Sequence, residues 1–142
     1  YGYTYFKKKQ IVSLIKICKI LIKKYKIKSK NVIGHSDVAP LRKIDPGEKF
    51  PWKILSAKQI GIWHHYNLKF LKKYRNKKIF DKDKNIKFVK NLNKIGYCIY
   101  TKKYLIMKKV ISAFQRHFRK ELINGRIDKE CLIISQSLVK NL

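Results

Sequence analysis

Acidic residues are scarce in this sequence, which has 8 Asp and Glu against 36 Lys and Arg and a formal net charge of +28 over 142 residues. Charge alone would indicate an anionic partner such as a nucleic acid or a membrane surface. Arginine is scarce too, with five among the basic residues, although nucleic-acid surfaces favour it. The lysines are spread along the chain among many Ile and Asn, which is typical of drift in an AT-rich genome. We therefore interpret most of them as solvated surface, with selected basicity as the alternative, and expect no nucleic-acid partner.

Cysteine is also scarce, and long apolar runs and a signal-peptide pattern do not occur in the sequence. The three cysteines, Cys18, Cys98 and Cys131, are odd in number and form no CxxC pair, so neither a thiolate zinc site nor a disulfide framework is supported. Lysines interrupt every apolar stretch, and no transmembrane segment is expected. The chain begins at Tyr1 without a signal-peptide pattern, which indicates a processed form or a fragment. Hydrophobic residues still make up 45% of the sequence, enough for a folded core.

The first half of the chain alternates between helical and extended patterns. Apolar residues at helical spacing predict an amphipathic helix that begins at Ile11 and ends near residues 26–30. The short β-branched stretch 31–34 predicts a buried strand that leads to His35, followed by a loop over 36–51 and a short helix from Pro51. Helix, strand and loop together predict an α/β fold, here incomplete because the strand has no partner in this chain.

The second half predicts a small all-α three-helix bundle. One apolar helical face ends at Gly96, a residue suited to a left-handed C-cap. A stronger face runs from Met107 to Leu122 and stops before the turn Asn124-Gly125. Asp128 is placed to cap the third helix. Phe114 and Phe118 are expected in the core rather than in a sugar-stacking platform, with His117 and Arg119 on the opposite side of the helix.

The loop after the predicted strand carries the residues with the most chemistry. His35 and Asp45 are N and O donors of the kind that bind Zn²⁺, and Lys43 is a cation that can face a developing oxyanion. On the residues alone this is a weak motif. A structural histidine, an Asp-Pro-Gly turn and one more solvated lysine are the ordinary alternatives.

Two stretches closely resemble one known family. Residues 34–52 resemble the second half of the zinc site of the N-acetylmuramoyl-L-alanine amidase type 2 family, in its AmiD-like branch. Residues 114–119 and 124–128, which read FQRHFR and NGRID, resemble the C-terminal peptidoglycan-binding domain of that branch. The resemblance divides the chain into the C-terminal portion of a catalytic domain (1–66), a linker (67–83) and a peptidoglycan-binding-like domain (84–142).

The resemblance implies a zinc-dependent peptidoglycan hydrolase that cleaves the amide between N-acetylmuramic acid and L-alanine in the cell envelope, in the periplasm or at the outer membrane. His35 and Asp45 would be metal ligands and Lys43 a catalytic residue that stabilises the oxyanion, while Asp37 matches a non-ligand turn position. Nothing here corresponds to the family's first zinc histidine or its general-base glutamate, so the chain alone is expected to be inactive. The alternatives are a non-catalytic cell-wall-binding remnant and, less favoured, a basic nucleic-acid-binding protein.

Two further groups of residues have open interpretations. The adjacent pair His64 and His65 is expected at the surface or between domains rather than on the metal, because neighbouring imidazoles rarely point at one ion. Three arginines are candidates for contacts with carboxylates of stem peptides in peptidoglycan or muropeptides, solvated surface being the alternative: Arg116, Arg119 and Arg126. The sequence indicates no oligomeric state.

Overall fold

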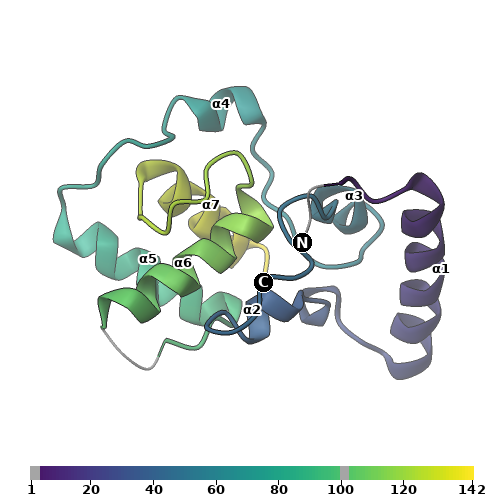
Figure 1. Ribbon diagram of the computed structural model, residues 1–142. Helices are drawn as coiled ribbons and strands as arrows, with labels where there is room; N and C mark the ends of the chain where they lie inside the picture. The colour runs from purple at the N-terminus through teal and green to yellow at the C-terminus, as the bar shows by residue number, and fades with distance from the viewer. Residues whose placement is uncertain (1–3, 100–102) are drawn as a thin grey trace.

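The computed structural model describes residues 4–99 and 103–142, and these residues form seven α-helices and one short 3₁₀ helix. Helix α1 lies at one side of the molecule, α2 and α3 lie in the middle, and α4 to α7 gather at the other side (Figure 1). No described helix is long and apolar enough to cross a membrane.

Helix α1 (Lys8–Tyr25) follows the predicted apolar spacing and ends at Lys26, whose backbone is left-handed. Its inner face packs on a small cluster made by Trp52, Leu55 and Ile60. No residue of α1 is fully buried, so this helix is held by one side only. Its partly buried contacts with the cluster are Leu14, Ile15, Cys18 and Ile22.

The predicted α/β fold is wrong, because the structure has no strand in the residues it describes. The stretch 31–34 keeps an extended backbone at Val32 and Gly34. No described segment runs beside it to form a ladder, and the amide of Val32 instead closes a 3₁₀ turn on Ser29 (Ser29–Asn31 is the 3₁₀ helix). Ile33 is half exposed rather than buried. A β-branched run becomes a strand only when a neighbouring strand takes its backbone hydrogen bonds.

Two short helices frame the loop that was predicted over 36–51. Helix α2 (His35–Val38) starts at the histidine itself, so this turn was missed. Helix α3 (Trp52–Ser56) follows Pro51 as predicted. Gly34 separates the loop from Trp52: a Cβ there would lie 2.9 Å from Pro46 and 3.2 Å from the indole ring. Only glycine fits this close approach.

The predicted bundle is confirmed in its three helices, α5 (Lys82–Ile95), α6 (Tyr104–Phe118) and α7 (Lys129–Lys140). Gly96 caps α5 in a left-handed conformation, and the Asp128 carboxylate accepts the amide of Cys131 at the start of α7. Helices α5 and α7 pack closely on each other. The bundle core is apolar, as predicted for Phe114 and Phe118. Its fully buried residues include Phe88, Leu92, Val110, Phe114, Ile134 and Leu138.

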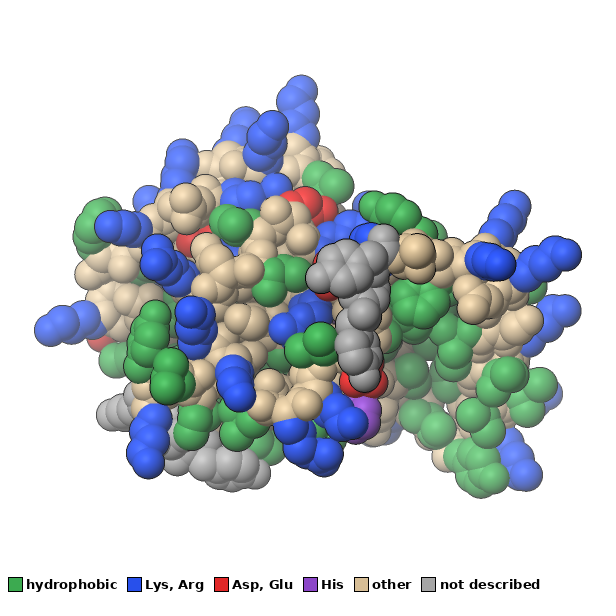
Figure 2. Space-filling model, viewed as in Figure 1, with side chains coloured by type: hydrophobic (Ala, Val, Ile, Leu, Met, Phe, Trp, Pro, Cys, Tyr) green, Lys and Arg blue, Asp and Glu red, His purple; other side chains and the backbone are tan. Residues whose placement is uncertain are grey.

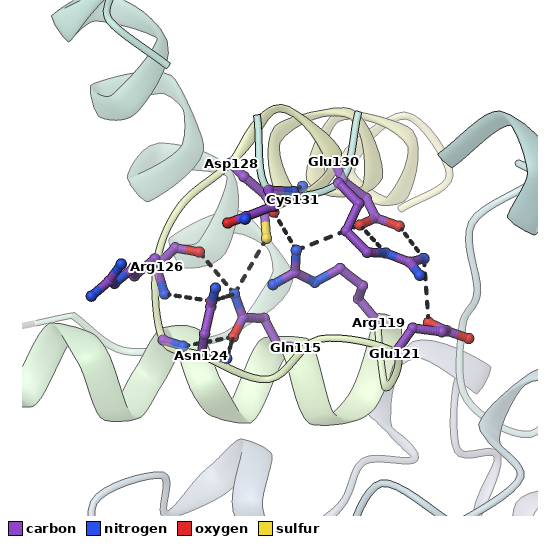
Figure 3. Close-up of polar contacts among 11 residues, drawn as sticks. Gln115, Arg119, Glu121, Asn124, Arg126, Asp128, Glu130 and Cys131 are labelled. Atoms are coloured by element: carbon purple, nitrogen blue, oxygen red, sulfur yellow. Dashed lines mark hydrogen bonds and ion pairs between the residues drawn. The ribbon is translucent and has the colours of Figure 1, made fainter. Parts of the chain in front are cut away.

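Helix α6 ends at Phe118 rather than at Leu122, and the loop that follows folds back onto it. The side-chain oxygen of Gln115 accepts the amides of Asn124 and Gly125, and its nitrogen donates to the carbonyl of Arg126 (Figure 3). Gly125 has a positive φ of +67°. The turn predicted at Asn124-Gly125 is therefore held by Gln115, a buried glutamine of the preceding helix α6.

A buried charge cluster links this loop to the segment before α5. The guanidinium of Arg75 donates two hydrogen bonds of 2.8 Å to Glu130, and Arg119 donates to Asp128 (Figure 3). Arg119 is fully buried, so it does not face solvent or a ligand as the sequence-based interpretation allowed. Within the stretch 67–83, α4 (Leu68–Lys72) contributes Leu71 to the bundle core.

Candidate functional site

His35 and Asp45 lie side by side in the structure. His35 is the first residue of α2, and its Nδ1 is 3.1 Å from Oδ2 of Asp45. The two side chains are 47% and 41% exposed. The amide of Ser36 donates to the carbonyl of Asp45 over 2.9 Å, which ties the two ends of the loop together. A nitrogen and an oxygen donor thus meet at an open surface.

The pair has the donor chemistry of a zinc site but not the number of ligands. Zn²⁺ prefers N, O and S donors and usually has four ligands, of which three or four come from the protein and the remainder is water. Within residues 4–99 and 103–142, no group of three or more His, Cys, Asp or Glu side chains is placed to hold a metal ion. His35 and Asp45 therefore fit part of a metal centre, and their role as ligands stays a prediction.

Asp37, two residues after His35, is the centre of a buried hydrogen-bond network. Its carboxylate accepts the amide of Gly34 (2.8 Å), the hydroxyl of Tyr97 (2.5 Å) and Nδ1 of His117 (2.7 Å). Burial favours the neutral acid, but the hydrogen bonds from His117, Tyr97 and Gly34 outweigh it and lower the pKa of Asp37. The network fixes the backbone next to His35 to the helical bundle.

His117 belongs to this network and not to the solvent-facing side of α6. Its ring stacks on Trp52 at a centroid distance of 4.0 Å and on Phe118 at 3.9 Å. Helix α6 thus presents His117 to α2 and α3, which contribute Asp37 and Trp52. The sequence-based expectation that His117 lies opposite the core is wrong, because α6 is buried on two sides. The sequence offered one signal for this contact. Acidic residues are scarce in the chain, so an aspartate two residues after the candidate ligand His35 suggests that the carboxylate of Asp37 has a partner inside the protein.

Lys43 lies half-buried in the same loop, two residues before Asp45. This part of the loop is fastened to α6, where Nζ of Lys109 donates to the carbonyl of Leu41 over 2.9 Å. Lys43, Arg42 and Arg116 line one groove between the loop and the helix. The structure therefore brings His35 and Asp45 into contact, while Lys43 lies in the same loop beside a groove that basic residues of α6 also line.

His64 and His65 connect the first half of the chain to the bundle. His64 is buried, and desolvation lowers its pKa to about 4. Nδ1 of His65 lies 2.8 Å from the hydroxyl of Ser137 on α7. These contacts agree with an interdomain position.

The comparisons with known proteins agree on one family. The model of the family described as N-acetylmuramoyl-L-alanine amidase matches residues 1–48. The chain is 34% identical to N-acetylmuramoyl-L-alanine amidase AmiD of Escherichia coli over 95% of its length and 49% of that protein. It is 42% identical to 1,6-anhydro-N-acetylmuramyl-L-alanine amidase AmpD of Haemophilus influenzae, over 31% of this chain and 24% of the relative.

Two solved structures share the whole arrangement. The complex of Escherichia coli AmiD with anhydro-N-acetylmuramic acid-L-Ala-D-γ-Glu-L-Lys superposes with a TM-score of 0.82 at 34% identity, covering 96% of this chain and 53% of that one. AmpDh3 of Pseudomonas aeruginosa also superposes with a TM-score of 0.82, at 31% identity over 99% of this chain and 56% of that one. The chain spans about half the length of AmiD. Over nearly its whole length it is similar to N-acetylmuramoyl-L-alanine amidases of type 2, in their AmiD-like branch.

Proposed function

We propose that this chain supplies the second half of the zinc site of a peptidoglycan amidase, which cleaves the amide between N-acetylmuramic acid and L-alanine. The observation that supports this most directly is the contact of 3.1 Å between His35 and Asp45, in a loop that also holds Lys43. The family model matches this same part of the chain. The proposed place of action is the cell envelope, with peptidoglycan or muropeptides as substrate.

In this proposal His35 and Asp45 hold the metal, and further ligands come from outside the described residues. When bound, Zn²⁺ supplies an activated water and polarises the substrate carbonyl. The chain's own task is to keep the two donors together at an open surface. Closure of the loop by the Ser36–Asp45 backbone hydrogen bond, and the close packing at Gly34, both serve that purpose.

Lys43 is the proposed oxyanion partner. An ammonium group in the loop that carries the metal pair can stabilise the negative charge that develops on the carbonyl oxygen as the amide is attacked. Such a contact acts mainly on the transition state, so its loss lowers kcat more than it raises KM. Its position in a loop held at Leu41 by Lys109 supports a fixed role over that of a freely moving surface lysine.

The test uses the 142-residue chain and a chimera in which the matching remainder of Escherichia coli AmiD supplies the other half. Release of stem peptide from an anhydro-muropeptide is measured for both. We expect turnover by the chimera, and a fall in kcat of about 10²- to 10³-fold in its Lys43→Ala variant. Lys90→Ala, which changes an exposed lysine on α5, is the matched control. A chimera that folds and binds zinc but does not hydrolyse would contradict the proposal.

A second candidate is a binding-only role, in which residues 84–142 hold cell-wall fragments and no catalysis occurs. It is favoured by one observation: no metal-binding group of three side chains lies within the described residues. The same chimera distinguishes the two. Sedimentation with purified sacculi without any turnover would support the binding-only role.

A further inference from the structure

The apolar side of helix α1 is wider than the cluster on which it packs. Leu14 and Cys18 are among the residues of this side that contact the cluster. Ile17, Leu21 and Tyr25 follow one another at four-residue steps along the flank of the same side, and they are 55%, 42% and 61% exposed. Figure 2 shows hydrophobic side chains open to solvent where α1 lies in Figure 1. These three residues, the outer stripe of α1, form an apolar surface that the cluster leaves uncovered.

Residues 31–34 present an open backbone edge next to the same cluster. Val32 packs on the cluster, and the backbone is extended at Val32 and Gly34. The amide and the carbonyl of Ile33 make no hydrogen bond to the backbone of residues 4–99 or 103–142, and the residue is 49% exposed. In a β-strand the N–H and C=O of one residue point to the same side and pair with a neighbouring strand. Ile33 therefore offers both groups to an added strand.

We propose that the outer stripe and the edge at Ile33 form one docking surface for a second polypeptide, which pairs a strand with Ile33 and covers Ile17 and Leu21. Both features border the same cluster, so one partner can reach them together. The inference rests on the proposed function, in which further metal ligands come from outside the described residues. Paired strands lie about 5 Å apart, and only Gly34 separates Ile33 from His35. A strand at this edge therefore brings its own polypeptide beside the metal pair.

Charge and hydrogen bonding favour a different polypeptide over a second copy or a membrane. Every charged residue of α1 is a lysine, and each copy of the chain carries a formal charge of +28, so two copies repel each other at this surface. An anionic bilayer would attract the lysines, but lipid tails cannot satisfy the N–H and C=O of Ile33. A strand satisfies both groups, and apolar residues beside it cover the stripe. The surface therefore fits a β-strand of a polypeptide that is not strongly basic.

The test combines the 142-residue chain with the part of Escherichia coli AmiD that lies outside the match, made in the same cells as a separate polypeptide. We expect the two to co-purify as a complex, in which the amide of Ile33 exchanges with deuterated water at least about tenfold more slowly than in the chain alone. Ile17→Ser/Leu21→Ser should weaken the complex at least about tenfold. The matched control is Val12→Ser/Ile20→Ser, which removes two similarly exposed apolar residues from the side of α1 that carries most of its lysines. The control should change affinity less than about twofold.

Absence of a complex would overturn the inference, as would equal weakening by both double variants or an Ile33 amide that exchanges as fast in the complex as in the free chain. If the chain alone sediments as a dimer and the stripe variant as a monomer, the surface belongs to a second copy. If the stripe variant loses binding to phosphatidylglycerol vesicles and keeps the complex, the surface belongs to a membrane.

Hydrolysis of an anhydro-muropeptide by the complex is measured separately, so that the two proposals can fail independently. A complex that forms through the stripe and does not hydrolyse would reject the proposed function and leave the docking surface standing. An active complex whose affinity ignores the stripe would reject the docking surface alone.

Discussion

Two histidine–aspartate pairs lie close together in this protein and differ mainly in burial. His35 and Asp45 are 3.1 Å apart, with side chains 47% and 41% exposed. His117 and Asp37 are 2.7 Å apart, with side chains 3% and 7% exposed. The same two residue types thus occur once at an open surface and once in a core.

Their surroundings give the two pairs different tasks. The open pair competes with water, contributes little to stability and leaves lone pairs available to a ligand. The carboxylate of the buried pair is already surrounded by donors, from Gly34, Tyr97 and His117. A buried pair costs desolvation and is strongly coupled to its partners. We infer that the buried pair holds the bundle to the loop on which the open pair is displayed.

Removing His117 is expected to have the largest effect. His117→Ala takes a hydrogen bond from a buried carboxylate and a ring from between Trp52 and Phe118. We expect the free energy of unfolding, measured by urea denaturation, to fall by about 3–5 kcal/mol. His35→Ala is the matched control and should change it by less than about 0.5 kcal/mol. Similar losses in both variants would show that burial does not make the two pairs differ in their contribution to stability.

His64 extends the comparison of the two pairs, because it is a buried histidine whose ring nitrogens have no hydrogen-bond partner among the described residues. Its effect should appear in the pH dependence of stability. Its pKa is about 4 in the folded protein, against 6.5 for the ordinary group. The unfolded chain therefore takes up this proton first as pH falls, and stability should drop between pH 6.5 and 4 by about 3 kcal/mol. His64→Leu should remove this part of the pH dependence. The free energy of unfolding is measured by urea denaturation at each pH. If it falls with pH as steeply in the variant as in the parent, a group other than His64 causes the loss of stability.

The sequence predicts the bundle better than the first half of the chain, for a physical reason. The helices α5 to α7 depend on local spacing and on local caps such as Asp128 and Gly96, which the sequence displays. The stretch 31–34 has strand-forming residues, but a strand depends on a partner that the described chain does not provide. Helices can thus be predicted from apolar spacing and capping residues within one segment, whereas a strand also requires a neighbouring strand that the segment itself does not reveal.

The candidate site shows the same difference between a contact that local sequence predicts and one that it does not. His35 and Asp45 are ten residues apart in one loop, and a motif suffices to connect them. Asp37 and His117 are 80 residues apart, and no periodicity or spacing relates them. Their contact depends on how α6 docks on α2, which only tertiary packing determines. A family resemblance led us to expect the exposed pair, whose role as metal ligands stays a prediction, but it did not lead us to expect the buried pair that supports it.

Zinc titration tests the open pair directly. With two protein ligands, the 142-residue chain should bind Zn²⁺ weakly and lose it to a chelator on dialysis. His35→Ala should weaken zinc binding at least about tenfold in calorimetry, because one of two donors is gone. His65→Ala, which changes an exposed histidine bonded to Ser137, is the control and should bind as the parent does. Equal loss in both variants would disprove the ligand assignment.

Asp37→Asn should have the smallest effect, because an amide can keep every hydrogen bond of the buried network. One oxygen must still accept from Gly34 and His117, and the new amide nitrogen then faces the hydroxyl of Tyr97, which can rotate to accept. We expect a loss of about 1 kcal/mol in the free energy of unfolding, against about 3 kcal/mol for Asp37→Ala, which leaves all three donors unpaired.

The double variant Asp37→Asn/Tyr97→Phe makes this test specific. The parent already has a hydrogen bond from Tyr97 to Asp37, and in the asparagine variant a reoriented hydroxyl replaces it by accepting from the amide, so removing the hydroxyl should cost stability in both backgrounds and the two losses should be close to additive. The measurement is a double-mutant cycle by urea denaturation. A double variant no less stable than the single asparagine variant would show that Tyr97 does not reorient. An asparagine variant as unstable as the alanine one would show that the pair with His117 needs the negative charge of Asp37 and not only its hydrogen bonds.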